Sequence, residues 1–190
     1  MRSSDASADR PDFDLIMASV DTRMIVVTTA AGGERAGCLV GFHAQSSVDP
    51  PRYTVWLSKA NHTYRVALRA SHVGVHFLTE GDVPLAEIFG TRTGDTTNKF
   101  AGLTVTEGPG GVPLLLGCAN RFAARRIALL DEGGDHVCVV TEPVQTWASG
   151  RFAPLSLVHV RHLEPGHGTE ERNNPPTERA TTTPGSEARE

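Results

Sequence analysis

The sequence predicts a single, mostly β domain, and three observations lead to this prediction. Several short runs rich in Val, Ile, Thr and aromatic residues are separated by Gly, Pro and Asn signals that are typical of turns. Segments with helical patterning are few. The chain has 190 residues, of which 39% are hydrophobic, and this is enough apolar mass for one core. Six strands at this spacing are typical of a barrel.

The six predicted strands are punctuated by glycine and proline. Gly32 and Gly33 lie between the first two strands and favour a hairpin turn. Pro50 and Pro51 end one extended segment before the next strand begins. A further run, from Arg121 to Arg126, has no clean period and is interpreted as an edge strand with one solvated face. The six strands are predicted over residues 24–29, 36–40, 53–57, 73–78, 136–140 and 155–160.

Two short helices are predicted within this β framework. The first runs from Asn61, a potential N-cap, through residues 63–70. The second covers residues 83–90, with Asp82 as N-cap, a proline in the first turn and Gly90 as C-cap. Helices therefore interrupt a mostly antiparallel β fold.

Both ends of the chain are polar, and the domain boundaries follow from this. Residues 1–11 and 164–190 contain too few apolar side chains to offset the entropy of ordering, so we expect them to be disordered around a folded unit of residues 12–163. No apolar run approaches the length of a membrane-spanning helix, and the N-terminal segment lacks the apolar stretch of a signal peptide. We therefore expect a cytoplasmic protein without a membrane partner.

Composition excludes several classes of function. The net charge is −4 and the eighteen Lys and Arg residues are dispersed, which argues against nucleic acid as a partner. The three cysteines, Cys38, Cys118 and Cys138, are far apart and lack metal-ligand spacing, so we interpret them as buried small side chains and expect no metal. Hydrolase elbows, zinc-protease motifs and P-loops are absent from the sequence.

Two segments are unusual for a plain β core. Residues 35–51 pass from a strand with small side chains into a polar loop, which is typical of a backbone that approaches a planar ligand closely. Residues 56–63 leave another strand and place Lys59 beside Asn61 and Thr63 at the start of the predicted helix. A helix start with hydroxyl, amide and ammonium groups suits a phosphate monoester.

These segments and four later ones together resemble the flavin reductase-like domain family, whose members are FMN-binding split barrels. The resemblance begins with Val-Thr-Thr29, Ala36-Gly-Cys-Leu-Val-Gly-Phe-His-Ala-Gln-Ser-Ser-Val-Asp-Pro-Pro51 and Val55-Trp-Leu-Ser-Lys-Ala-Asn-His-Thr63. Asn98-Lys-Phe-Ala-Gly102, Gly111-Val-Pro-Leu-Leu115, Gly134-Asp-His-Val137 and Gly150-Arg-Phe152 follow in the family's order. No single piece is specific, but the ordered set spans essentially the whole folded unit.

The resemblance implies a six-stranded antiparallel Greek-key split barrel that forms a homodimer and binds FMN near the subunit interface. It implies that His136 meets the nicotinamide side of the flavin. It also implies three groups of cofactor-binding residues. They are Leu39, Val40, Gly41 and Phe42 with Trp56, Leu57 and Ser58 along the ring, Asn61, His62 and Thr63 with Lys59, Lys99 and Phe100 around the phosphate, and Phe152 beside the groove.

The sequence departs from the family pattern at the ring, and several residues have structural alternatives. Relatives commonly carry hydroxyl side chains where Leu39, Gly41 and Phe42 stand, so the affinity and choice of flavin stay open, although backbone N–H groups could still bind it. Without the family resemblance, Trp56 and Phe100 are interpreted as core aromatics rather than cofactor contacts. His62 also suits an exposed surface, and Asp135 either orients His136 or caps a turn. His43 is interpreted as a solvent-facing loop residue, His72 and His76 as structural strand residues, and the arginines of residues 121–126 as minor candidates for phosphate binding.

The function implied by the resemblance is an NAD(P)H:flavin oxidoreductase that passes hydride from NADH or NADPH to FMN, with FAD or riboflavin as other flavins, and supplies a partner monooxygenase. Three alternatives stay open. They are a flavin carrier without nicotinamide turnover, a split-barrel oxidoreductase that uses deazaflavin or haem, and a cofactor-free domain for dimer assembly. The chemistry would belong to the two cofactors, so the absence of an acid–base constellation does not argue against an enzyme.

Overall fold

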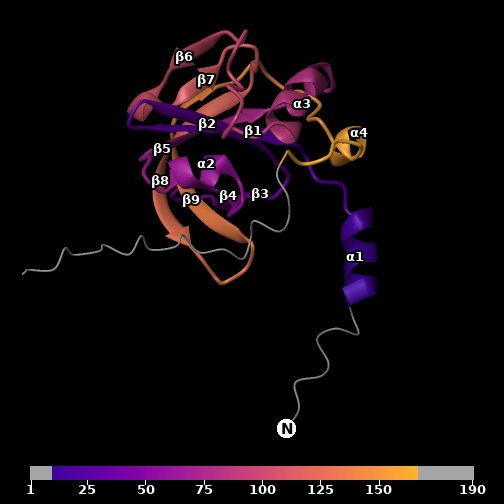
Figure 1. Ribbon diagram of the computed structural model, residues 1–190. Helices are drawn as coiled ribbons and strands as arrows, with labels where there is room; N and C mark the ends of the chain where they lie inside the picture. The colour runs from indigo at the N-terminus through magenta and orange to yellow at the C-terminus, as the bar shows by residue number, and fades with distance from the viewer. Residues whose placement is uncertain (1–9, 167–190) are drawn as a thin grey trace, which may run out of the picture.

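The computed structural model describes residues 10–166 as a curled antiparallel sheet with short helices around it (Figure 1). The strands are β1 (Ile25–Ala31), β2 (Glu34–Val40), β3 (His43–Ser47), β4 (Arg52–Ser58), β5 (His72–Phe77), β6 (Val105–Glu107), β7 (Pro113–Leu115), β8 (Arg121–Leu130) and β9 (His136–Trp147). The helices are α1 (Arg10–Ser19), α2 (His62–Ala67), α3 (Val83–Thr91) and α4 (Leu157–Val160), with short 3-10 turns at Glu80–Asp82 and Pro109–Gly111.

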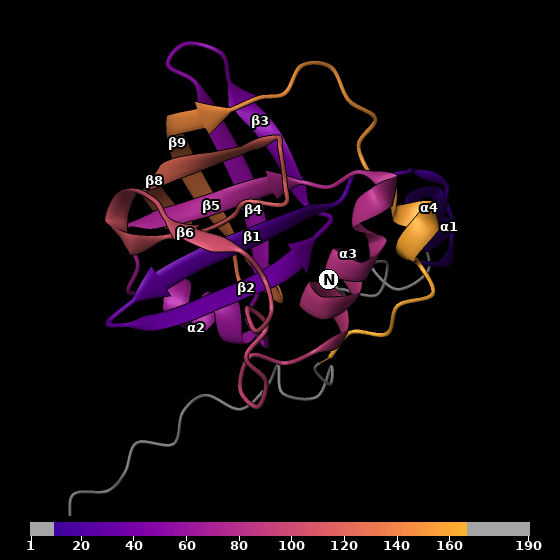
Figure 2. The same cartoon turned by 90° about the horizontal axis from the view of Figure 1, so that it is seen from above.

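The main sheet has seven strands in the order β2-β1-β5-β8-β9-β4-β3, and β6 and β7 form a separate pair. All pairings are antiparallel, and the sheet curls until β2 contacts β4 (Figure 2). The Trp56 backbone N–H of β4 donates a hydrogen bond of 2.9 Å to the carbonyl oxygen of Phe42, which lies between β2 and β3. We call this meeting of the β2 end and the β4 end the seam. The predicted antiparallel barrel is confirmed, with seven strands in its sheet where six were expected.

Five of the six predicted strands are confirmed, as β1, β2, β4, β5 and β9. The hairpin turn predicted from the two glycines between the first two strands is also present, and Gly32 and Gly33 have φ of +59° and +81°. Two successive positive φ values match the right-handed twist of the flanking strands and favour glycine. The turn therefore sets the register that pairs Val27 with Cys38 and Ile25 with Val40.

The sixth predicted strand, over residues 155–160, is wrong. The segment forms an isolated bridge between Ser156 and Arg23 and then turns into α4. Leu155 and Val160 are both buried in the core from this conformation. A short apolar run fits a strand and a helical turn equally well, and tertiary packing decides between them.

The predicted edge strand over residues 121–126 is a strand, but its position at an edge is wrong. It belongs to β8, which lies between β5 and β9 inside the sheet, and the edges are β2 and β3. The arginines of this segment contact other residues of the same chain. Arg126 donates to the Ala67 carbonyl oxygen at 2.9 Å, Arg125 pairs with Glu142, and Arg121 lies over the Trp147 ring at 4.9 Å. Aliphatic stems and local polar partners let charged residues stay on a central strand.

Both predicted helices are confirmed, with corrections at their ends: α2 ends at Ala67 and not at residue 70, and α3 differs from the prediction at both ends. Asn61 is the N-cap of α2, and its side-chain oxygen accepts from the Thr63 backbone N–H at 3.0 Å. Asp82 is the N-cap of α3, but its carboxylate accepts from Thr79 instead of capping the helix. Gly90 is not the C-cap, because α3 continues to Thr91. A Cβ on Gly90 would lie 3.0 Å from a Leu39 methyl group, so this glycine allows close packing of α3 on β2.

The core has two main parts, one inside the curled sheet and one between the sheet and the helices. The first includes Val27, Val55 and Val139, and the second includes Met24, Phe89 and Leu155. Cys38 and Cys118 are buried as expected, whereas Cys138 is half-buried. Figure 2 shows α3 and α4 together beside the β1–β2 end of the barrel. The C-terminal part of the described chain therefore packs next to the seam.

Two histidines contact other groups of the fold through both of their ring nitrogens. The His76 ring is fully buried, lies 3.1 Å from the Val26 carbonyl oxygen through Nδ1, and accepts from the Leu115 backbone N–H at 3.0 Å through Nε2. This confirms its structural role. His43, for which a solvent-facing loop position was one alternative, lies in β3 and contacts the Tyr53 hydroxyl at 2.6 Å and the Arg23 carbonyl oxygen at 2.7 Å.

We expect His76 to make the protein sensitive to mild acid. Burial lowers the pKa of His76 from 6.5 to about 4, so the unfolded chain binds a proton that the folded chain excludes between these values. This contribution to stability is intact above pH 6.5 and is lost as the pH falls to 4, by about 3 kcal/mol. Denaturant unfolding across this range, with an NMR titration of the His76 ring, tests it. A ring that titrates near 6.5 in the folded protein would contradict the prediction.

The two polar ends are largely outside the described residues, because residues 1–9 and 167–190 are not described. Arg10 and Pro11 begin α1, which the sequence analysis did not predict. This helix extends away from the barrel in Figure 1 and exposes Phe13, Leu15 and Ile16. Within residues 10–166, no helix is long and apolar enough to cross a membrane.

Candidate functional site

A cavity of about 470 Å³ lies at the seam. The ends of β2 and β4 form one side of it, and α3, α4 and the chain after α4 form another. We call it the seam cavity. Nine of the fifteen predicted site residues line it, and they are Leu39, Val40, Gly41, Phe42, Trp56, Leu57, Ser58, Asn61 and His136.

The two strand ends meet here because β2 continues through Gly41 and Phe42 into β3, which pairs back onto β4. Trp56 is half-buried and contributes to the cavity wall, so the structural alternative of a fully buried core aromatic does not apply to it. A Cβ on Gly41 would have its nearest neighbours at 3.5 Å, the Thr22 hydroxyl, and at 3.6 Å, the Met24 sulfur. The position therefore has room for a small side chain.

Ser58 provides a polar group in this mainly apolar wall. Its hydroxyl oxygen is buried and has no hydrogen-bond partner within the described part of the chain. Ser58 pairs in register with His136 at the β4–β9 border, so both residues lie at the same end of the barrel. A buried hydroxyl without a partner costs free energy, which a bound polar ligand would recover.

His136 begins β9 and is fixed by two neighbours. Its Nδ1 lies 2.8 Å from a carboxylate oxygen of Asp135, and its ring packs edge-on against Phe42 with centroids 5.3 Å apart. Of the two roles considered for Asp135, the contact supports orientation of the ring. An Nδ1–H that donates to this carboxylate leaves Nε2 as the remaining polar atom of the ring.

The opposite wall of the seam cavity comes from residues that the sequence analysis missed. They are Leu157, Val160, Arg161, Leu163 and Pro165, joined by Phe89 and Gly90 of α3. Leu157 and Val160 lie in the segment predicted as a strand, and Pro165 lies in the predicted polar tail. An apolar spacing of three residues between Leu157 and Val160 was the available signal, and it is too short to separate a helix from a strand.

A second cavity, of about 900 Å³, lies between the β1–β2 hairpin, the start of α2 and the loop of residues 94–100. We call it the polar cavity. His62, Lys99 and Phe100 from the predicted site line it, together with Glu34 and Asp95. The structure thus separates these three predicted residues from the nine in the seam cavity.

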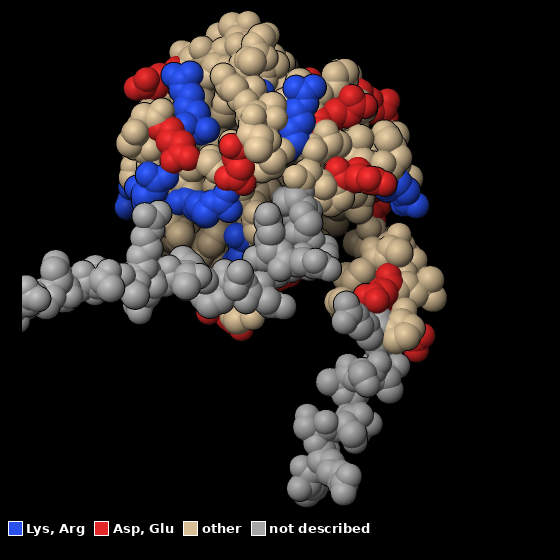
Figure 3. Space-filling model, in the orientation of Figure 1, with Lys and Arg blue, Asp and Glu red and all other residues tan. Residues whose placement is uncertain are grey.

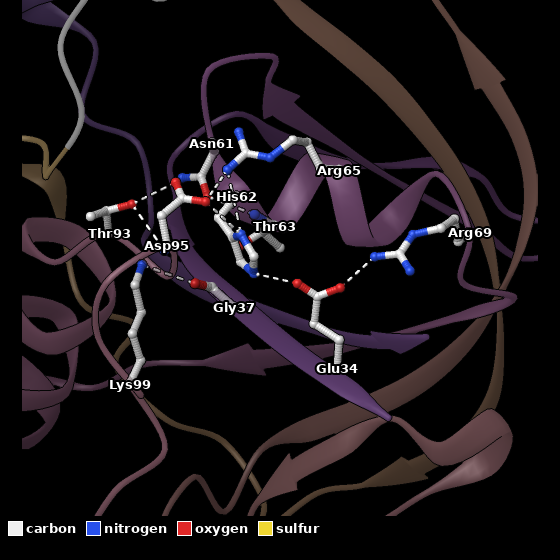
Figure 4. Close-up of polar contacts among 10 residues, drawn as sticks. All are labelled: Glu34, Gly37, Asn61, His62, Thr63, Arg65, Arg69, Thr93, Asp95 and Lys99. Carbon is white, nitrogen blue, oxygen red and sulfur yellow. Dashed lines mark hydrogen bonds and ion pairs between the residues drawn. The ribbon is translucent and has the colours of Figure 1, made fainter. Parts of the chain in front are cut away.

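His62 is held between two carboxylates at the polar cavity (Figure 4). Its Nε2 lies 3.2 Å from Glu34 and its Nδ1 lies 3.0 Å from Asp95. Arg69 pairs with the other carboxylate oxygen of Glu34, and Arg65 pairs with the same Asp95 oxygen that His62 contacts. The hydrogen bond from Arg65 holds the pKa of Asp95 at about 2. Both carboxylates would repel a phosphate at this position, and His62 is not simply exposed.

Lys99 is 5% exposed, and its ammonium group donates to the carbonyl oxygens of Gly37 and Phe89, both at 3.1 Å (Figure 4). Burial lowers the pKa of this ammonium, and the nearby Cys38 thiol and Asp95 carboxylate partly oppose the shift. Lys99 therefore ties β2 to the end of α3.

The last three predicted residues, Lys59, Thr63 and Phe152, line neither cavity. Lys59 pairs with Asp131 at 2.8 Å. Thr63 is buried at the start of α2, and its hydroxyl oxygen has no hydrogen-bond partner among the described residues. Phe152 packs on Phe77 with centroids 5.9 Å apart and lines neither cavity. Phe100 packs edge-on against Phe89 with centroids 5.5 Å apart, which fits its core alternative.

Charged side chains of both signs lie on the surface of the protein. Lys and Arg are interspersed with Asp and Glu over the face in Figure 3, without a basic stripe there. Among residues 10–166, no group of three or more His, Cys, Asp or Glu residues is arranged to hold a metal ion.

The chain is similar to known proteins over most of its length. The family model described as flavin reductase like domain matches residues 17–165. The reductase subunit HsaB of a flavin-dependent monooxygenase from Rhodococcus jostii is 27% identical over 147 residues, or 77% of this chain and 68% of the relative. The FMN reductase (NADH) SmoA from Agrobacterium fabrum is 30% identical over 130 residues, or 68% of this chain and 72% of the relative.

Solved structures share the fold at lower sequence identity. A flavin reductase domain protein from Arthrobacter sp. FB24 has a TM-score of 0.69 at 24% identity, covering 77% of this chain and 89% of that structure. The flavin reductase HpaC complexed with NADP+ has a TM-score of 0.68 at 23% identity, covering 77% and 92%. For an oxidoreductase from Sinorhizobium meliloti 1021, with a TM-score of 0.68 at 23% identity, the match covers 76% of this chain and 49% of that protein's length.

Proposed function

This chain belongs to the flavin reductase like domain family, and from that premise we propose that it is an NAD(P)H-dependent flavin reductase. The reaction passes hydride from NADH or NADPH to FMN. The observation that carries the proposal is the seam cavity, where nine predicted residues from β2, β4, β9 and the start of α2 meet. The Agrobacterium relative is an FMN reductase (NADH).

The residues of the seam cavity fit a flavin. Its volume of about 470 Å³ lies within the range of small-molecule sites, and its wall is mainly apolar with a few polar groups. The partnerless hydroxyl of Ser58 and the backbone of Gly41 supply polar atoms beside this apolar surface. When bound, the flavin supplies the ring that accepts the hydride.

The protein's own contribution is to bind, orient and shield. Leu39, Val40 and Trp56 offer apolar surface to a planar ring, and residues 41 and 42 offer backbone groups where side-chain hydroxyls are lacking. His136, oriented by Asp135, borders the side where the nicotinamide binds. Holding two reactants in one orientation makes the transfer effectively unimolecular, and no acid or base in the protein is required.

Nicotinamide oxidation by the purified full chain tests the proposal. We expect turnover of NADH or NADPH that depends on FMN, and a comparison with FAD and riboflavin ranks the flavins. A yellow protein without turnover would instead indicate a flavin carrier. The absorption spectrum of a deazaflavin or haem would select the related oxidoreductases.

Replacing Ser58 by Ala is expected to separate folding from flavin binding. Removing a buried hydroxyl that lacks a partner leaves the free energy of unfolding unchanged or raises it by about 1 kcal/mol. Loss of one hydrogen bond to the flavin raises the Kd for FMN by roughly 3- to 10-fold. Denaturant unfolding without flavin and fluorescence titration with FMN measure the two effects. An unchanged Kd would show that Ser58 does not contact the flavin.

We also infer that the protein forms a homodimer and supplies reduced flavin to a monooxygenase in the cytoplasm. Exposed apolar side chains on α1, including Phe13, Leu15 and Ile16, support a protein partner for this helix. The Rhodococcus relative is named as the reductase subunit of a monooxygenase. The cysteines are free thiols, in keeping with a reducing compartment.

Sedimentation of the wild type and of a Leu15→Glu variant tests the dimer, which the variant should weaken.

A further inference from the structure

We propose that Arg161, at the end of α4, is the cation that binds the phosphate of FMN in the seam cavity. This inference rests on the proposed flavin reductase function and deepens it, because it gives the site a preference for a phosphorylated flavin over riboflavin. It also assigns a binding role to the segment after β9, where the sequence analysis placed a strand and a polar tail.

The cations that the sequence nominated for the phosphate are already engaged with the protein. Lys59 pairs with Asp131, and the Lys99 ammonium donates to two backbone carbonyl oxygens from a buried position. The His62 ring lies between Glu34 and Asp95. A phosphate would have to displace a partner from each of these groups, and at His62 it would also meet two carboxylates.

Arg161 differs from these cations in position and in pairing. It lines the seam cavity together with the predicted ring contacts, and it is the only Lys or Arg among the described residues of that lining. Its side chain is exposed and has no ion-pair partner within residues 10–166. No Asp or Glu of the described chain lines the same cavity. A free guanidinium in a cavity without carboxylates favours an anion, and its planar fork suits phosphate oxygens.

The backbone around Arg161 is held in place by the core. The Leu157 backbone N–H donates to the Thr22 carbonyl oxygen at 2.8 Å, and Leu155 and Val160 are buried between the sheet and α3. Arg161 is the C-cap of α4. The guanidinium therefore extends from a packed element, which lowers the entropy cost of ordering it on a ligand.

The size of the cavity also favours a mononucleotide. A volume of about 470 Å³ lies in the lower part of the range for ligand sites and suits one ring system with a short phosphorylated chain. The larger polar cavity has the space for a phosphate, but Glu34 and Asp95 line it. It also contains Arg35, for which no ion pair is seen among the described residues, so Arg35 is the natural competitor in a test.

The test compares two ligands that differ only by the phosphate. The Kd values of FMN and riboflavin are measured by fluorescence titration for the wild-type full chain, Arg161→Gln, Arg161→Lys and Arg35→Gln. Arg92→Gln is the matched control, because Arg92 is exposed and lines neither cavity. For Arg161→Gln we expect the Kd of FMN to rise about 10- to 100-fold with the Kd of riboflavin unchanged, and for Arg161→Lys a smaller rise. The control should bind both as the wild type does.

Three results would overturn the inference. They are an unchanged ratio of the two Kd values in Arg161→Gln, a selective loss of FMN binding in Arg35→Gln in its place, and wild-type binding of FMN that does not weaken with salt relative to riboflavin. The salt series decides the case if Arg161→Gln loses both flavins through misfolding. If the wild type binds and turns over both flavins equally well, the role of Arg161 is wrong but the flavin reductase function stands. If the wild type binds neither flavin, both the role of Arg161 and the proposed function are wrong.

Discussion

His136→Ala is expected to lower kcat/KM for reduced nicotinamide by roughly 100-fold while the Kd of FMN stays within about 2-fold of the wild type. The ring of His136 borders the seam cavity, held by the Asp135 carboxylate at 2.8 Å and by the edge of Phe42. In the proposed arrangement the nicotinamide is oriented against this ring, so its removal would misplace a reactant, and a small misplacement costs much of the rate. Steady-state kinetics with NADH and flavin titrations measure the two effects.

Two further variants show whether the effect is specific to the oriented ring. Asp135→Asn keeps the ring and weakens its orientation, so we expect a smaller loss in kcat/KM than for His136→Ala. His72→Gln replaces a histidine of β5 that lines neither cavity and should behave as the wild type. Unchanged turnover in His136→Ala would place the nicotinamide elsewhere and favour a flavin carrier.

Phe89→Ala is expected to lower the free energy of unfolding by about 3–5 kcal/mol, a large share of the roughly 5–15 kcal/mol of a typical domain. The Phe89 side chain is 1% exposed, packs against Phe100, and stands where a Cβ on Gly37 would come within 2.7 Å of it. Truncation leaves a void between α3 and β2 that the sheet cannot close. Denaturant unfolding without flavin gives the change directly.

The same variant should also weaken flavin binding, because Phe89 lines the seam cavity. The control is Leu116→Ala, which truncates an exposed side chain and should cost less than about 1 kcal/mol. If Phe89→Ala were as stable as this control, α3 would not be packed on β2 as the structure has it.

Local signals in the sequence were sufficient for many elements. The paired glycines 32 and 33 specified the first hairpin, Asn61 specified the start of α2, and β-branched runs specified five strands of the sheet. Each of these features depends on residues within a few positions of one another, and local sterics and capping act at that range. The ordered motifs then indicated the family, which the match over residues 17–165 confirms.

Other features depend on contacts between distant segments, and only the tertiary structure decided them. The apolar run at residues 155–160 fits a strand or a helix until it packs beside Met24 and Leu78. The neighbouring sequence of a polar residue does not show whether that residue has a partner in the fold. Lys99 binds the Gly37 carbonyl oxygen, Lys59 binds Asp131, and His62 contacts Glu34, and these partners lie up to 72 residues away in sequence. The sequence by itself determined the first hairpin turn, five strands of the sheet and the family. The curling of the sheet decided which polar groups are already paired, because pairing between distant groups depends on the closed barrel and not on neighbouring residues. It also placed Arg161, for which residues 10–166 supply no ion-pair partner, at the seam cavity.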